Sequence, residues 1–297
     1  MTRLLASGLL LAGALILLLL PLRRSPWIDV GSRQIDNISG LAFVPAPGGS
    51  GQPDGNTLVL VHDNKLPDEP RVGLVRRADG RYTPLTWPAG YALPFDLEAV
   101  TAVPGDDTTL LALSSNGTVF VLTLSGGTLG LRGTFTLPDR QAGANFEGLR
   151  MQRVGAVPLL VWGDRGTGRR PARLAWGRLD FDTYTVDRVR WAALQVPYPS
   201  STDPATRHLT DLDVTTEGDV WIAAASDPGD RGPFYSAVYL AGRLTWQDGQ
   251  ATFAPAPRLR TMTAFDRKIE AVAISPAGIV VGTDDEILGS ALTTLSR

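Results

Sequence analysis

The sequence contains no cysteine and only two histidines, His62 and His208. The lack of thiols excludes disulfide bonds, thiolate catalysis, zinc–cysteine sites and a cysteine-linked lipid anchor. The 28 basic residues nearly balance the 30 acidic ones, so the chain lacks the excess of positive charge that is typical of nucleic-acid-binding proteins. We therefore expect no nucleic-acid partner. Any catalysis would have to use carboxylates, hydroxyls, arginines or a hard metal ion.

Helical periodicity is also missing over any stretch of twelve or more residues beyond the N-terminal segment. Instead, short apolar runs of about five to seven residues are rich in leucine or β-branched side chains and are bounded by Gly, Asp, Asn or Pro. The clearest of them are 57–62, 109–113, 118–124, 158–163 and 278–283. The sequence therefore predicts an all-β protein.

One long apolar run is present at the N-terminus, from Leu4 to Leu22, with Arg23 and Arg24 directly after it. Such a run is typical of a signal peptide or an uncleaved signal anchor. No small-x-small cleavage site precedes Trp27, which favours retention as a membrane anchor over cleavage. We expect residues 1–26 to form this hydrophobic helix. Residues 27–297 are then expected to form one extracytoplasmic domain, periplasmic or in the cell envelope, either membrane-anchored or secreted.

A five-residue pattern occurs five times in the remaining chain. The copies are 37–41, 96–100, 145–149, a looser one at 208–212, and 268–272, and their central residues lie 59, 49, 63 and 60 positions apart. Self-similarity at this period in a β-rich chain predicts a five-bladed β-propeller, which we expect to be a monomer. Residues 270–297 have room for about three strands. We expect residues 27–35 to supply the fourth strand of the last blade and close the ring.

A second polar position follows the first at a regular distance. It is 17 residues from Glu98 to Ser115, and 17 residues again from Glu147 to Asp164. Two strands and a turn return the chain to the end where it began, so both positions are expected at one mouth of the ring. The sequence predicts an inner circle of Ser39, Glu98, Glu147, Thr210 and Glu270. It predicts an outer ring of Asp63, Ser115, Asp164, Asp227 and Asp284.

Three glutamates that face one narrow axis repel each other unless they are protonated or bridged by a cation. Together with the hydroxyls of Ser39 and Thr210 they form an all-oxygen ligand set, which suits Ca²⁺. The sequence thus predicts one axial Ca²⁺ held by the five inner-circle residues. The alternative is that each glutamate accepts backbone N–H bonds from the next blade.

The order of the inner-circle residues resembles the axial calcium site of the five-bladed calcium-activated apyrases. Residues 146–149 (Phe-Glu-Gly-Leu) and 163–166 (Gly-Asp-Arg-Gly) are also similar to the phytase-like, esterase-like β-propeller proteins of bacteria. The resemblance runs from about residue 35 to the end and implies a calcium-dependent hydrolase of phosphate esters. Apyrases carry an Asp-Asp-Arg loop after the second strand of their first blade. Here that position reads His-Asp-Asn-Lys at 62–65, and Asp-Arg occurs in blade three.

Catalytic and substrate-binding roles follow from a metal at this mouth. Asp164 or Asp284 would be the general base, and Arg165 would neutralise oxyanion charge. The expected contacts of a small anionic substrate are Asp63, Lys65, Asp227, Arg231 and Lys268. The alternative is a non-catalytic envelope binding or scaffold propeller in which calcium only ties the blades together, since propellers host both kinds of function.

Overall fold

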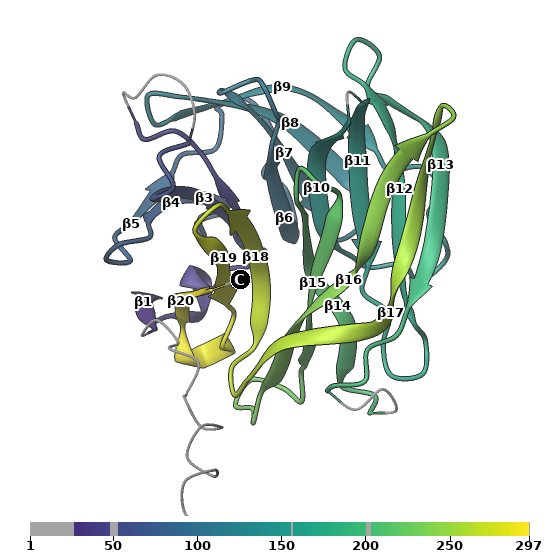
Figure 1. The fold of residues 1–297 in the computed structure, drawn as a ribbon. Coiled ribbons are helices and arrows are strands. Elements are labelled where there is room, and N and C mark those ends of the chain that lie inside the picture. The colour runs from purple at the N-terminus through teal and green to yellow at the C-terminus, as the bar shows by residue number, and fades with distance from the viewer. Residues whose placement is uncertain (1–26, 48–52, 156, 200–202, 297) are drawn as a thin grey trace, which may run out of the picture.

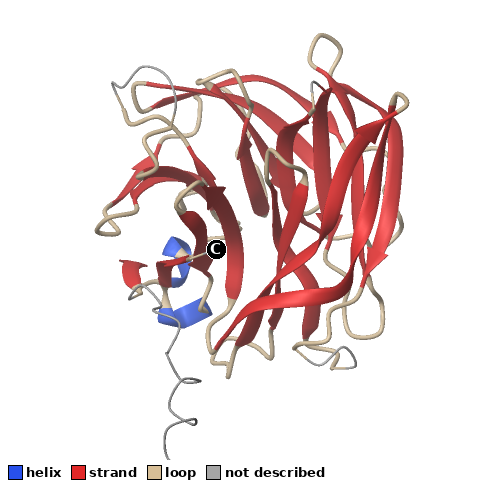
Figure 2. Ribbon diagram, in the orientation of Figure 1, coloured by secondary structure: helices blue, strands red, loops and turns tan. Residues whose placement is uncertain are grey.

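The computed structural model describes residues 27–47, 53–155, 157–199 and 203–296. They form five antiparallel sheets of four strands each, so the all-β five-bladed propeller is confirmed (Figure 1). Helical structure in these residues is limited to two 3₁₀ turns, η1 (Gln34–Asp36) and η2 (Glu286–Leu288) (Figure 2). No helix in the described part of the chain is long and apolar enough to cross a membrane. The predicted N-terminal helix lies outside the described residues.

Each of the first four blades is built from four consecutive strands. Blade one contains β2 (Gly40–Phe43), β3 (Thr57–Val61), β4 (Val72–Arg76) and β5 (Tyr82–Leu85). Blade two contains β6 (Leu97–Ala102), β7 (Thr109–Ser114), β8 (Thr118–Ser125) and β9 (Thr128–Thr136). Blade three contains β10 (Phe146–Val154), β11 (Val157–Asp164), β12 (Ala172–Asp180) and β13 (Thr185–Leu194). Blade four contains β14 (Thr206–Val214), β15 (Asp219–Ser226), β16 (Tyr235–Gln247) and β17 (Gln250–Phe265).

Blade five joins the two ends of the described chain. It contains β18 (Ile269–Ser275), β19 (Gly278–Thr283), β20 (Ser290–Leu295) and, as its fourth strand, β1 (Ile28–Gly31). β1 lies antiparallel to β20, with Ile28 opposite Leu292 (Figure 1). The predicted closure from the N-terminal side is therefore confirmed. The described strands of the ring thus all lie within residues 28–295.

The hydrophobic core consists of five clusters, and each cluster lies between two neighbouring blades. One example is the fully buried Tyr239 of blade four, which belongs to the cluster shared with blade three. Burial of a large apolar side chain contributes about 1.5–3 kcal/mol. The blades are therefore held together mainly by the packing of one sheet face against the next.

The inner strands β2, β6, β10, β14 and β18 lie side by side around the axis, and β18 returns to β2. At Gly40 the approach is so close that a Cβ atom would lie 2.7 Å from the Cα atom of Ala99. This explains why the fourth residue of the repeated pattern is Gly or Ala in four of its five copies. The repeat thus encodes the contact between neighbouring inner strands.

Candidate site at the mouth of the propeller

Each inner strand begins, and each second strand ends, at the same end of the ring, which we call the mouth face. The register shows this directly: Gly40 pairs with Val61, Phe146 with Asp164, and Ile269 with Thr283. Both predicted polar positions of each repeat therefore lie at the mouth face. The 17-residue spacing was a correct guide to the strand–turn–strand geometry.

The three axial glutamates occupy matching positions in their blades. The register of the inner strand shifts between Leu97 and Ala99, between Phe146 and Gly148, and between Ile269 and Ala271. Glu98, Glu147 and Glu270 are thus each the extra residue of a β-bulge, a device that turns a side chain away from the regular alternation of the strand. All five inner-circle side chains are buried.

Two of the three glutamates have basic partners. Glu147 forms an ion pair with Arg165, with 3.1 Å between Oε1 and Nη1. Glu270 pairs with Arg207 Nη1 at 3.1 Å and with Lys268 Nζ at 3.2 Å. The charge of these two carboxylates is therefore already compensated by the protein.

Glu98 is different. Within the described residues, its carboxylate has no hydrogen-bond or ion-pair partner, although it is buried. Burial raises the pKa of Glu98 well above its ordinary value, and repulsion by Glu147 adds to this shift. Three further acidic side chains act on this pKa in the same direction: Asp96, Asp63 and Glu270. The mouth thus contains one carboxylate whose charge is not balanced locally.

The hydroxyl members of the inner circle make protein contacts. Thr210 Oγ1 donates to the carbonyl oxygen of Ile269 at 2.7 Å, and Ser39 Oγ accepts from the backbone N–H of Asp63 at 3.2 Å. The alternative given above was that the glutamates accept backbone N–H groups of the next blade. In the structure, Asp211 and Asp213 accept such groups instead. Their carboxylates accept from blade-five amides, each at 2.7 Å.

The outer ring contains two carboxyl groups with raised pKa values. Burial, followed by repulsion from Glu270, raises the pKa of Asp284 to about 7, although Lys268 Nζ lies 2.9 Å from its Oδ2. Burial and repulsion by Asp284 raise the pKa of Asp63 to about 6. Both groups can therefore exchange a proton near neutral pH, which is the property of a general acid or base.

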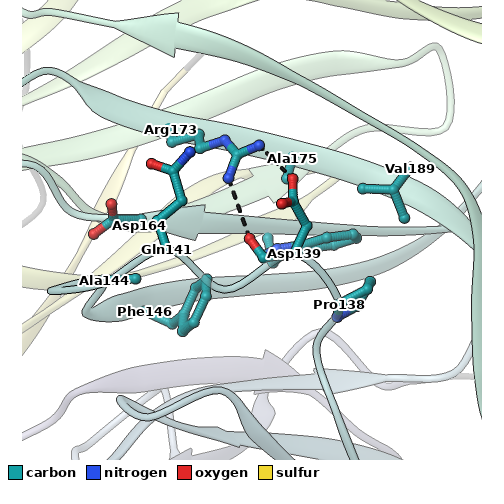
Figure 3. A pocket seen from close by; sticks show the side chains of 10 residues that line it. Pro138, Asp139, Gln141, Ala144, Phe146, Asp164, Arg173, Ala175 and Val189 are labelled. Carbon is teal, nitrogen blue, oxygen red and sulfur yellow. Dashed lines mark hydrogen bonds and ion pairs between the residues drawn. The ribbon is translucent and has the colours of Figure 1, made fainter.

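The other members of the outer ring are engaged by neighbouring groups. Asp227 pairs with Arg207, and Ser115 Oγ donates to Asp96. Asp164 pairs with Arg170 and accepts the backbone N–H of Asn145 at 3.1 Å. Asp164 also borders a small cavity between blade three and the connection that leads into it from β9, where Arg173 donates to Asp139 (Figure 3). At about 10 Å³ that cavity has room for about one water molecule but not for a substrate.

The predicted substrate contacts are only partly gathered at the mouth. Lys268 is buried and reaches Glu270, Asp284 and Glu286, and it lies 3.7 Å from Asp227. Lys65 pairs with Asp96 at 2.8 Å and lies 3.9 Å from Asp63. Arg231 is exposed and forms no ion pair within the described residues.

Sequence reasoning missed Arg207, which joins Glu270 to Asp227. The adjacent His208 is buried, and its Nε2 lies 2.6 Å from the carbonyl oxygen of Gly168. His62 is equally enclosed, 2.6 Å from the carbonyl oxygen of Asn37, and burial lowers its pKa to about 4. Both histidines therefore hold loops in place.

We call the connected set of charges at the mouth the axial charge network. It contains four basic residues, Lys65, Arg165, Arg207 and Lys268, and eight acidic ones, Asp63, Asp96, Glu98, Glu147, Asp227, Glu270, Asp284 and Glu286. Acidic groups therefore exceed basic ones. Among the described residues, no three His, Cys, Asp or Glu side chains are already gathered closely enough to hold a metal ion. Binding of a cation would therefore require further oxygen ligands to move toward Glu98. The calcium site of five residues stays a prediction.

Comparison with known proteins adds little beyond the fold. The sequence matches no protein-family profile and no curated protein. Among solved structures, it is similar to the β-propeller domain of Cps50 (Swd1) from Myceliophteria thermophila, with 10% identity over 88% of this chain and 84% of that chain. The TM-score is 0.42, so this likeness carries no argument about function. The propeller assignment rests on the five sheets and their closing strand.

Proposed function

We propose that the mouth of this propeller binds a divalent cation at Glu98, with Ca²⁺ as the first candidate, and that the protein hydrolyses a small anionic ester such as a phosphate ester. The observation that carries the proposal is the buried, unpaired carboxylate of Glu98 within an axial charge network that has more acidic than basic groups. A hard cation relieves this repulsion, and Ca²⁺ accepts carboxylate, hydroxyl and water oxygens in a flexible shell.

The chain also has groups that suit an anionic ester. Arg165, Arg207 and Lys268 carry positive charge on the side of Glu147 and Glu270. Such groups bind phosphoryl oxygens and stabilise the charge that develops on them during hydrolysis. When bound, the cation would polarise the ester oxygen.

The network also contains candidate proton acceptors. The pKa values of Asp63, about 6, and Asp284, about 7, suit removal of a proton from a water molecule at neutral pH. Asp63 is the more accessible of the two, with a half-exposed side chain. Asp164, predicted above as an alternative base, is less suited because Arg170 and a backbone amide already engage its carboxylate.

A second candidate function is that of a non-catalytic binding or scaffold propeller. A specific observation favours it: Glu147 and Glu270 are already neutralised by Arg165, Arg207 and Lys268, so the network can hold the blades together without chemistry. In that case calcium at Glu98 would raise stability but would support no turnover.

An assay of residues 27–297 on a panel of phosphate esters, with calcium or with EDTA, separates the two. We expect calcium-dependent turnover that is lost in both Glu98→Gln and Glu147→Gln. Calcium binding and a higher Tm without turnover on any ester would overturn the hydrolase and support the scaffold. A protein whose Tm and activity are unchanged by calcium and by Glu98→Gln would contradict both.

A further inference from the structure

The exposed large apolar side chains of this protein are concentrated at one end. Nine such residues occur in the described chain, and eight belong to connections or strand starts at the mouth face: Leu66, Tyr91, Leu93, Phe95, Tyr198, Tyr235, Ile287 and Leu288. The ninth, Trp191, lies within β13, the outermost strand of blade three. Among the described residues, the connections at the opposite end contribute none. This distribution is not expected for a uniformly solvated surface.

These residues come from separate loops. Leu66 lies between β3 and β4, Phe95 between β5 and β6, and Leu288 at the end of η2 between β19 and β20. Their exposed fractions are 59%, 59% and 66%. Apolar side chains at separate loop tips can each insert into a lipid bilayer, whereas a protein partner more commonly buries one contiguous patch.

The apolar loop residues are also next to charged groups of the mouth. Lys65 directly precedes Leu66, and its Nζ lies 5.9 Å from the centre of the Phe95 ring. Glu286, which pairs with Lys268, directly precedes Ile287 and Leu288. Exposed apolar side chains next to charged ones match the change from apolar to polar surroundings at the headgroup level of a bilayer.

The start of the described chain lies near the same face. The Trp27 ring is 4.8 Å from the Arg267 guanidinium, and Arg267 pairs with Asp285 in the loop before η2. The predicted membrane segment ends at Leu22, and five residues of extended chain span at most about 17 Å. A protein anchored through that segment therefore has the mouth face close to the bilayer.

From these observations we propose that the mouth face docks on a lipid bilayer surface through Leu66, Phe95, Leu288 and the neighbouring apolar loop residues. The docked orientation gives the axial charge network access to ligands that reside in the membrane. Docking needs neither the cation nor the hydrolytic activity proposed above.

Co-sedimentation with vesicles tests this in the absence of the N-terminal segment. Residues 27–297 are mixed in EDTA with vesicles of phosphatidylcholine, alone or with about 30% phosphatidylglycerol. We expect binding that decreases about tenfold in the triple variant Leu66→Ser/Phe95→Ser/Leu288→Ser, since each substitution removes apolar area from the bilayer. The matched control is Pro276→Ser, an exposed apolar residue in the turn between β18 and β19 at the opposite end of the ring, which should bind like the wild type.

Two outcomes would overturn the proposal. One is no binding to either vesicle. The other is equal loss in the triple variant and in Pro276→Ser, which would indicate non-specific adsorption. A circular dichroism spectrum and Tm equal to those of the wild type establish that the triple variant is folded, and single substitutions replace it if it is not. Because EDTA is present throughout, failure of the calcium hypothesis would leave this result unchanged.

Discussion

At the scale of single residues, Glu98 differs from the other axial glutamates in having no basic ion-pair partner in the part of the chain that the structure describes. Glu147 and Glu270 sit in the same kind of bulge but are matched by Arg165, Arg207 and Lys268. Sequence reasoning predicted the ring of oxygen-bearing residues, because the repeated pattern marks each copy. It did not predict which glutamate is unpaired. Arg207 directly precedes the loosest copy of the pattern, and nothing local in the sequence indicates that its guanidinium reaches Glu270 in the next blade.

The unpaired state of Glu98 predicts a pH effect. Its pKa is raised in the folded protein, so ionisation destabilises the fold as pH rises above the unfolded value of about 4.3. Ionisation of Asp63 and Asp284, whose pKa values in the folded protein are about 6 and about 7, destabilises the fold in the same way over about pH 4–7. In EDTA, Glu98→Gln should therefore be more stable than the wild type at pH 8, and the difference should shrink at pH 5. Thermal unfolding at the two pH values measures it, and a variant that is less stable at pH 8 would refute this.

Lys268 is the most heavily engaged cation of the network. Lys268→Met should remove the basic partner of the buried Asp284 and one of the two basic partners of Glu270, and cost about 3–5 kcal/mol of unfolding free energy. The control, Lys65→Met, removes a half-exposed lysine and should cost no more than about 1 kcal/mol. Urea denaturation measures both, and similar small costs would show that the buried pairs around Lys268 are not needed for stability.

At the scale of strands, the starts of the inner strands β6, β10 and β18 do two tasks. A small residue lets neighbouring inner strands approach, and a bulge directly before it turns a glutamate out of the regular strand alternation. Strand positions could be predicted because apolar runs and turn residues alternate clearly, as in residues 278–283, which form β19. The bulges could not be predicted, since they depend on pairing between strands and leave no composition signal.

Blades four and five are additionally joined by carboxylate-to-backbone hydrogen bonds. Asp211 Oδ2 accepts the backbone N–H of Val272 at 2.7 Å. Asp211→Ala should leave this buried amide unpaired and lower the unfolding free energy by about 1–3 kcal/mol. Hydrogen exchange of the Val272 amide should also become faster. The control, Glu217→Ala in the exposed turn before β15, should change stability by less than about 0.5 kcal/mol, and an equally small effect of Asp211→Ala would contradict the prediction.

At the scale of the whole molecule, the five repeats and the closing strand make a ring whose two ends differ. The mouth face holds the axial charge network and most of the exposed apolar side chains, so both proposals concern the same end of the propeller. The sequence indicated this end through the repeated polar positions. The exposed apolar side chains of the mouth face could not be predicted as a group, because they belong to loops far apart in the chain. They come together on one face only when the ring closes.

The central claim is that this mouth is a cation site centred on Glu98. Isothermal titration calorimetry of residues 27–297 with calcium at neutral pH, in two buffers of different ionisation enthalpy, tests it most directly. We predict saturable binding with proton release, because the cation displaces protons from carboxyl groups with raised pKa values, and at least a tenfold loss of affinity in Glu98→Gln. The absence of binding heat in both buffers, or equal affinity of the wild type and Glu98→Gln, would contradict the claim.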